Sequence, residues 1–141
     1  MPKSNIFQSS PTTSSIYFLL LQFSDGGFFK AKLTFSSDYP YVPPKMQFIS
    51  EMWHPNIYKD GTVCISILHP PGNDPNQYEK AEERWTPVHT VESILVSVVS
   101  MLASPNDESA ANLDAAKDWR EEPKVFKKKV RDTIRRAQED L

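Results

Sequence analysis

The stretch FFKAKLTF, Phe28 to Phe35, alternates apolar residues with polar ones. Successive side chains of a β-strand point to opposite faces, so this period of two predicts a strand with one buried face and one hydrated face. The apolar set and the polar set are Phe29, Ala31, Leu33 and Phe35 against Lys30, Lys32 and Thr34.

Two further strands are predicted on either side of this stretch. Residues 16–23 form an apolar run that ends at a turn containing Gly26 and Gly27. After the proline-rich turn at residues 40–44, alternation resumes. Turns between short alternating runs are typical of an antiparallel meander. The apolar positions of the last run are Met46 and Phe48, and its polar positions are Lys45 and Gln47.

The second half of the chain predicts helices. Thr90 can cap the first turn of a helix that Pro105 ends. Its apolar residues recur at intervals of three and four, so they form one stripe that should lie across the sheet. They are Val91, Ile94, Leu95, Val98, Val99 and Leu102.

Two more helices should follow. Asn112 is a candidate cap for a short helix through Trp119, and Pro123 suits the first turn of a last helix. The apolar side of that last helix is Phe126, Val130, Ile134 and Ala137. Strands followed by helices predict the α+β class. A core domain over residues 16–141 is expected, whereas residues 1–15, rich in Ser, Thr and Pro, are predicted to be disordered.

Composition excludes several classes of protein. The formal net charge of −2 gives no general reason to expect nucleic-acid binding, and the basic residues of the last helix are interpreted as a solvated face. The run at residues 16–23 is far shorter than the roughly 20 residues that cross a bilayer. A single cysteine favours a reducing compartment, the cytosol or nucleus.

That cysteine, Cys64, lies in the run HPNIYKDGTVCISIL at residues 54–68. A thiol near a side-chain amide suits acyl transfer, because sulfur can hold the acyl group while the amide donates a hydrogen bond to the oxyanion. The alternative is that Cys64 is a small buried apolar residue.

This run resembles the active-site segment of the ubiquitin-conjugating enzymes, in which a His-Pro-Asn triplet precedes the thioester-forming cysteine at the same spacing. Gly61 and the sequence YPYVPP at residues 39–44 belong to the same pattern. From Gly26 to about Gln138 the chain follows the family order, closest to the G-type branch. The resemblance implies the family fold, a meander sheet packed against a central helix with C-terminal helices.

The resemblance also implies an activity. Cys64 would accept ubiquitin from the activating enzyme as a thioester and pass it to a lysine of a substrate or of ubiquitin, guided by a ubiquitin ligase. ATP would be used by the activating enzyme, and this chain would bind no cofactor and no metal. Its expected place is the cytosol or nucleus, or the endoplasmic reticulum surface through a partner.

Four more residues are candidates for the site. By resemblance, Asn56 either donates to the oxyanion or holds the neighbouring loop, and a plain turn-forming role is the alternative. His54 is expected to be mainly structural. His69 and His89 leave a Cys-His hydrolase open, which would need an imidazole within hydrogen-bond reach of the sulfur.

Residues 72–83 form a polar insertion after the cysteine. By resemblance this is an acidic loop that assists ubiquitin-chain assembly, and its charge would attract the incoming lysine. A solvated surface loop is the alternative. The acidic residues singled out are Asp74, Glu79, Glu82 and Glu83.

Two surfaces are assigned by resemblance. Ser109 and Asp114 fall in the segment that gates the cysteine, although Asp114 also suits the N-terminus of a helix. Tyr41, Pro87 and Val88 fall where the family docks its ligases, although ordinary packing of turns would also explain them.

The front of the chain departs from the family pattern. Family members begin with a basic amphipathic helix and a strand that carries a tryptophan or similar core residue, and neither precedes Gly26. The run at residues 16–23 can take the place of that strand but does not match it, so the chain is interpreted as N-terminally truncated. Pro2, Pro11 and a Ser/Thr cluster argue against a helix in residues 1–25. A second interpretation therefore stays open, in which the chain binds ubiquitin or a ligase without being charged.

Overall fold

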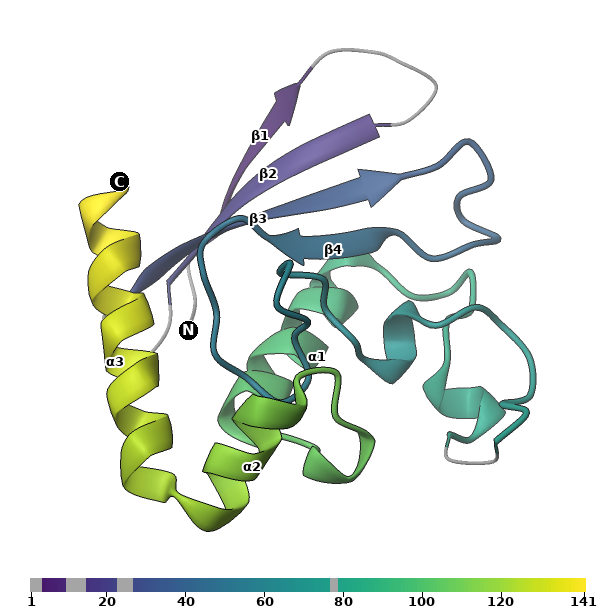
Figure 1. Ribbon diagram of the computed structural model, residues 1–141. Coiled ribbons are helices and arrows are strands. Elements are labelled where there is room, and N and C mark those ends of the chain that lie inside the picture. The colour runs from purple at the N-terminus through teal and green to yellow at the C-terminus, as the bar shows by residue number, and fades with distance from the viewer. Residues whose placement is uncertain (1–3, 10–14, 23–26, 77–78) are drawn as a thin grey trace.

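A computed structural model describes residues 4–9, 15–22, 27–76 and 79–141. The described part contains one antiparallel sheet with the strands in sequence order. The strands are β1 (Ser4–Ser9), β2 (Ser15–Gln22), β3 (Phe28–Phe35) and β4 (Lys45–Phe48). Figure 1 shows the sheet as one layer, with the helices gathered below and beside it.

The predicted meander is confirmed. β3 has the predicted bounds, and its burial alternates residue by residue as the pattern required. β2 and β4 pair with it on either side, with Leu19 opposite Ala31 and Leu33 opposite Met46. Phe23 and Gly26 lie outside the described residues.

Strand β1 differs from the expectation of disorder over residues 1–15. Ser4–Ser9 pair with β2 along the whole strand, from Ser4 opposite Leu21 to Ser9 opposite Ile16. The composition argument considered only side-chain burial, whereas an added edge strand gains backbone hydrogen bonds that do not depend on side-chain type. Residues 1–3 and 10–14 lie outside the described residues.

The three predicted helices are also confirmed. They are α1 (Val91–Ala103), α2 (Leu113–Glu121) and α3 (Pro123–Glu139). The Thr90 hydroxyl accepts from the backbone N–H of Ser93, and the Asn112 side chain accepts from that of Ala115. Short 3₁₀ turns occur at η1 (Ser66–Leu68), η2 (Ala81–Glu83) and η3 (Asp107–Ser109).

The core lies between one face of the sheet and α1. Ala31 and Leu33 of β3 are fully buried, as are Ile94 and Val98 of the predicted α1 stripe. Helix α3 runs along the end of β3 (Figure 1). The Lys30 ammonium donates there to the Asp140 carbonyl oxygen at 2.6 Å. These elements fix the frame on which the loop after β4 is built.

Candidate active site

The loop that carries Cys64 is fastened to β4 by backbone hydrogen bonds. The N–H of Phe48 donates to the Gly61 carbonyl at 2.8 Å, and the N–H of Val63 donates to the Met46 carbonyl at 3.0 Å. The N–H of Cys64 then donates to the Asn56 carbonyl at 2.9 Å. The cysteine is therefore held next to the His-Pro-Asn triplet by the backbone alone.

His54 is buried, and both ring nitrogens are engaged. Its Nδ1 accepts from the backbone N–H of Asn56 at 3.0 Å, so its Nε2 carries the proton and donates to the Met101 carbonyl at 3.0 Å. Burial lowers the pKa of His54 to about 4, against two carbonyl hydrogen bonds that raise it. The ring is therefore a neutral brace between this loop and the end of α1.

The Asn56 side chain holds the segment before α2. Its Oδ1 accepts from the N–H of Asn106 at 2.8 Å, and its Nδ2 donates to the carbonyls of Asn106 at 2.7 Å and Ser109 at 3.4 Å. The Pro55 carbonyl also accepts from the N–H groups of Ala111 and Asn112. Of the roles considered for Asn56, these contacts match the loop-holding one, and its amide hydrogens already face carbonyl oxygens.

Cys64 is half-buried and faces a histidine. Its Sγ lies 3.7 Å from Nε2 of His69, whose Nδ1 lies 2.7 Å from Oε1 of Glu79. The hydrogen bond to Cys64 raises the pKa of His69 to about 9; Glu79 adds to this rise, and partial burial opposes it. The nearby charge of Cys64 also raises the pKa of Tyr58.

Glu79 is anchored on several sides. Its Oε1 accepts from the Ser66 hydroxyl at 3.1 Å, and its backbone N–H donates to the Asp74 carboxylate at 3.1 Å. Nε of Arg84 lies 3.4 Å from its Oε2, within ion-pair distance, although that buried N–H makes no aligned hydrogen bond within the described residues. The contact between Arg84 and Glu79 is therefore electrostatic rather than a hydrogen bond. The described part of the insertion thus folds back onto the cysteine.

The other predicted polar residues are exposed or serve other contacts. Asp114 pairs with Lys59 at 2.8 Å on the exposed surface, and the hydrogen bond from Lys59 lowers its pKa. Ser109 is exposed within η3. His89 packs on the ring of Trp85, with the ring centroids 5.6 Å apart.

The two remaining acidic residues of the insertion sit on η2. Glu82 is exposed, and the Glu83 carboxylate accepts from the N–H of Lys80 at 3.4 Å, which caps this turn. Of the four acidic residues singled out, Glu79 is thus the one whose carboxylate contacts His69. The sequence offered His69 and Glu79 as separate candidates, and nothing in their spacing paired them.

The three residues assigned to ligase docking are exposed on two loops that are tied together. Tyr41 is 74% exposed and Val88 is 84% exposed, and Pro87 is exposed beside it. Nε1 of the buried Trp85 donates to the Pro40 carbonyl at 2.8 Å, which holds the two loops together. Ordinary turn packing does not account for such exposed side chains.

The described residues contain no group of three or more His, Cys, Asp or Glu side chains arranged to hold a metal ion. Among their helices, none combines the length and the apolar character needed to cross a membrane.

Comparison with known proteins gives a consistent result. Residues 22–134 match the family described as "Ubiquitin-conjugating enzyme". "Ubiquitin-conjugating enzyme E2 7" of Triticum aestivum is 66% identical over 117 residues, which cover 83% of this chain and 69% of the relative. "Ubiquitin-conjugating enzyme E2 15" of Schizosaccharomyces pombe is 63% identical over 113 residues, 80% and 68% of the two chains. "Ubiquitin-conjugating enzyme E2 G2" of Bos taurus is 59% identical over 111 residues, 79% and 67%.

Proposed function

The chain belongs to the ubiquitin-conjugating enzyme family, and on that basis we propose that Cys64 is the residue that carries ubiquitin. Members of this family are transferases that act through a thioester intermediate, and their α+β fold is the one described above. The finer assignment concerns which residues of this chain perform each step.

The observation that carries the proposal is the placement of Cys64. Its sulfur is half-exposed at the end of a loop that buried His54 and Asn56 hold rigidly. In the first step Sγ forms a bond to the terminal carbonyl carbon of ubiquitin, and the thiolate of the activating enzyme leaves. In the second step a lysine amine forms an amide bond to that carbon, and the C–S bond to Cys64 breaks.

His54 and Asn56 act by positioning. Together with Pro55 they fix residues 106–112 beside the cysteine through the hydrogen bonds described above. Ser109 and Asp114 lie in or next to this segment and form the gate through which a lysine reaches the thioester. A side-chain amide that already holds a loop stabilises an oxyanion only after releasing one of its carbonyl partners.

The partners follow from the family. They are ubiquitin, the activating enzyme that uses ATP, and a ubiquitin ligase. The ligase binds the exposed Tyr41, Pro87 and Val88, because exposed aromatic and apolar side chains on a rigid support are typical binding hot spots. The single cysteine supports a reducing compartment, the cytosol or nucleus, and a partner can recruit the chain to the endoplasmic reticulum surface.

A charging assay tests this proposal. The purified chain is incubated with activating enzyme, ubiquitin and ATP, and the products are separated with and without thiol reductant. We expect a ubiquitin adduct that reductant removes, because a thiol exchanges with a thioester. Cys64→Ser should give an adduct that resists reductant, since an oxygen ester does not exchange in this way, and Cys64→Ala should give none.

The same assay addresses the alternative. A folded wild-type sample that forms no adduct, while still binding ubiquitin or a ligase, would refute the proposal and leave a binding module that is never charged. An adduct that survives Cys64→Ala would place the acyl group on another residue.

A further inference from the structure

We propose that His69, held by Glu79, accepts the proton of the attacking amine when ubiquitin leaves Cys64. The inference rests on the proposed role of Cys64 and extends it to a second catalytic group. It also gives the acidic insertion a chemical role, because Glu79 belongs to that insertion and acts as the positioning residue for the base.

The geometry defines a chain of three groups. The Glu79 carboxylate accepts the N–H of His69 Nδ1 at 2.7 Å, so the lone pair of the neutral ring lies on Nε2. That nitrogen faces Sγ of Cys64 at 3.7 Å. A carboxylate that fixes the tautomer of an imidazole, which in turn faces a nucleophile, is the arrangement used in acid–base catalysis of acyl transfer.

The backbone of His69 is also held through both of its polar groups. The backbone N–H of His69 donates to the Ser66 carbonyl, and its own carbonyl accepts from the N–H of Trp85 at 3.1 Å. In the described part of the chain, the ionisable groups in contact with the ring are Cys64 and Glu79. Arg84 and Asp74 contact Glu79, and Tyr58 interacts with Cys64.

The other described groups near the sulfur are poorly suited to accept a proton. Both nitrogens of His54 are used in buried hydrogen bonds, and the Asp114 carboxylate is paired with Lys59. Cys64 raises the pKa of Tyr58 above its ordinary value, so the phenol keeps its own proton at neutral pH. In its neutral form His69 carries its lone pair on Nε2, in contact with the reacting sulfur, so it is the group placed to accept the proton.

The step balances without any further reactant. The amine nitrogen forms a bond to the thioester carbon, and its proton moves to Nε2 of His69. The C–S bond breaks, and its electron pair stays on sulfur. The products are an amide, a Cys64 thiolate and an imidazolium beside it, and the imidazolium then gives its proton to solvent.

Discharge of a preformed thioester tests the role of His69. The wild type, His69→Gln and Glu79→Gln are charged, activation is stopped, free lysine is added, and loss of the adduct is followed from pH 6 to pH 10. At each pH the discharge rate of a variant is divided by that of the wild type, so that the effect of lysine ionisation on the rate cancels. For His69→Gln we expect a ratio near unity at the lowest pH that falls about 100-fold at high pH, where the wild-type ring is neutral.

Glu79→Gln should show a different signature. Glu79 raises the pKa of His69, so its removal should shift the midpoint of the imidazole titration to lower pH while a base remains present. Glu82→Gln removes the same charge from the same insertion without the contact to His69, and its discharge should follow the wild-type pH midpoint. A midpoint that moves equally in both variants would mean that loop charge, not positioning, governs the reaction.

Three results would overturn the proposal. A deficit in His69→Gln that is constant across pH would mean that the ring is only structural. If ubiquitin were released as fast without lysine as with it, the three groups would be activating water, as in a hydrolase. Failure of the folded wild type to charge would refute the role of Cys64 itself and this inference with it. Normal charging followed by a pH-independent deficit in His69→Gln would refute the inference alone.

Discussion

His54 is a residue that the fold requires to be neutral. Its folded pKa, about 4, lies below the ordinary value of 6.5, because burial penalises the charged ring. The unfolded chain therefore binds more protons than the folded chain as pH falls below 6.5. The stability that His54 contributes is complete above that pH and is lost as pH falls toward the folded pKa.

The loss of this stability at low pH gives a first prediction at the residue scale. Between pH 7 and pH 5 the His54 contribution should fall by about 2 kcal/mol, which urea unfolding at several pH values would measure. His54→Gln can retain a donor to the Met101 carbonyl but has no proton to gain, so its stability should fall less over the same range. Parallel pH curves for the two proteins would contradict the account.

The sequence could suggest single residues of this site but not their contacts. Cys64, Asn56 and His54 were named from their motif, and the expected structural role of His54 agrees with its two buried hydrogen bonds. The contact between His69 and Glu79 could not be foreseen, because a loop sets no fixed spacing between residues that meet. Only the folded insertion brings that carboxylate to the ring.

At the scale of elements, the turn at Gly61 positions the cysteine. Gly61 has φ of 93°, and a Cβ added there would lie 2.0 Å from the Phe48 carbonyl oxygen. Gly61 and Phe48 approach each other at the point where the loop meets β4. A displacement of the backbone at Gly61 would therefore also move Cys64, three residues later in the same segment. The glycine is needed both for its backbone conformation and for the space that it leaves.

The second prediction concerns this turn. Gly61→Ala should lower the free energy of unfolding by about 3 kcal/mol or more, because positive φ strain adds to a clash with backbone. Gly72 is the matched control, since it also has positive φ, 111°, but a Cβ there would meet nothing within 4 Å. Gly72→Ala should cost only about 1–2 kcal/mol, the strain of a left-handed backbone conformation alone. Similar losses in urea unfolding would mean that the Gly61 contact relaxes easily.

Regular elements were predictable where their signals are local. The alternation in β3, the spacing in α1 and the caps at Thr90 and Asn112 each depend on neighbouring residues, and each is found as expected. Strand β1 was not predicted, because its pairing depends on backbone groups of β2 rather than on a pattern within Ser4–Ser9.

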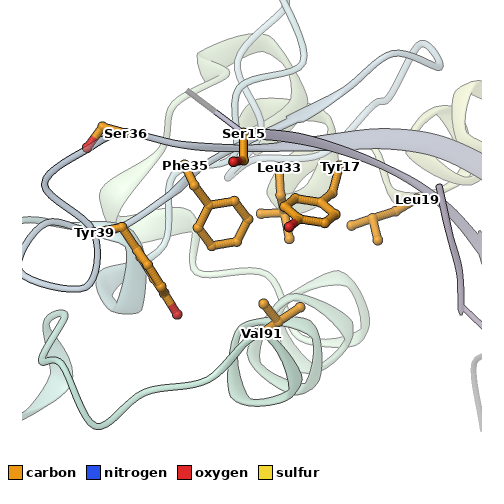
Figure 2. A pocket seen from close by; sticks show the side chains of 8 residues that line it. All are labelled: Ser15, Tyr17, Leu19, Leu33, Phe35, Ser36, Tyr39 and Val91. Carbon is orange, nitrogen blue, oxygen red and sulfur yellow. The ribbon is translucent and has the colours of Figure 1, made fainter. Parts of the chain in front are cut away.

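At the scale of the whole molecule, the sheet and α1 form two layers that do not meet completely. A pocket of about 460 Å³, open to solvent on one side, lies between them near the first turn of α1. Figure 2 shows Tyr17, Leu33 and Phe35 on the sheet side and Val91 on the helix side. The α+β class was predictable from element order, whereas the closeness of the two layers depends on side-chain volumes from distant parts of the chain.

This gap leads to the last prediction. Val91→Leu adds one carbon directed toward the pocket and should raise the free energy of unfolding by up to about 0.8 kcal/mol, the value for burying a methylene completely. Val96 lies on the same helix but is 60% exposed, so Val96→Leu makes the same chemical change without that burial. Urea unfolding of both variants would isolate the difference. If Val91→Leu proved no more stable than Val96→Leu, the space between sheet and helix would be closed to the added group, and the two layers would already be in contact there.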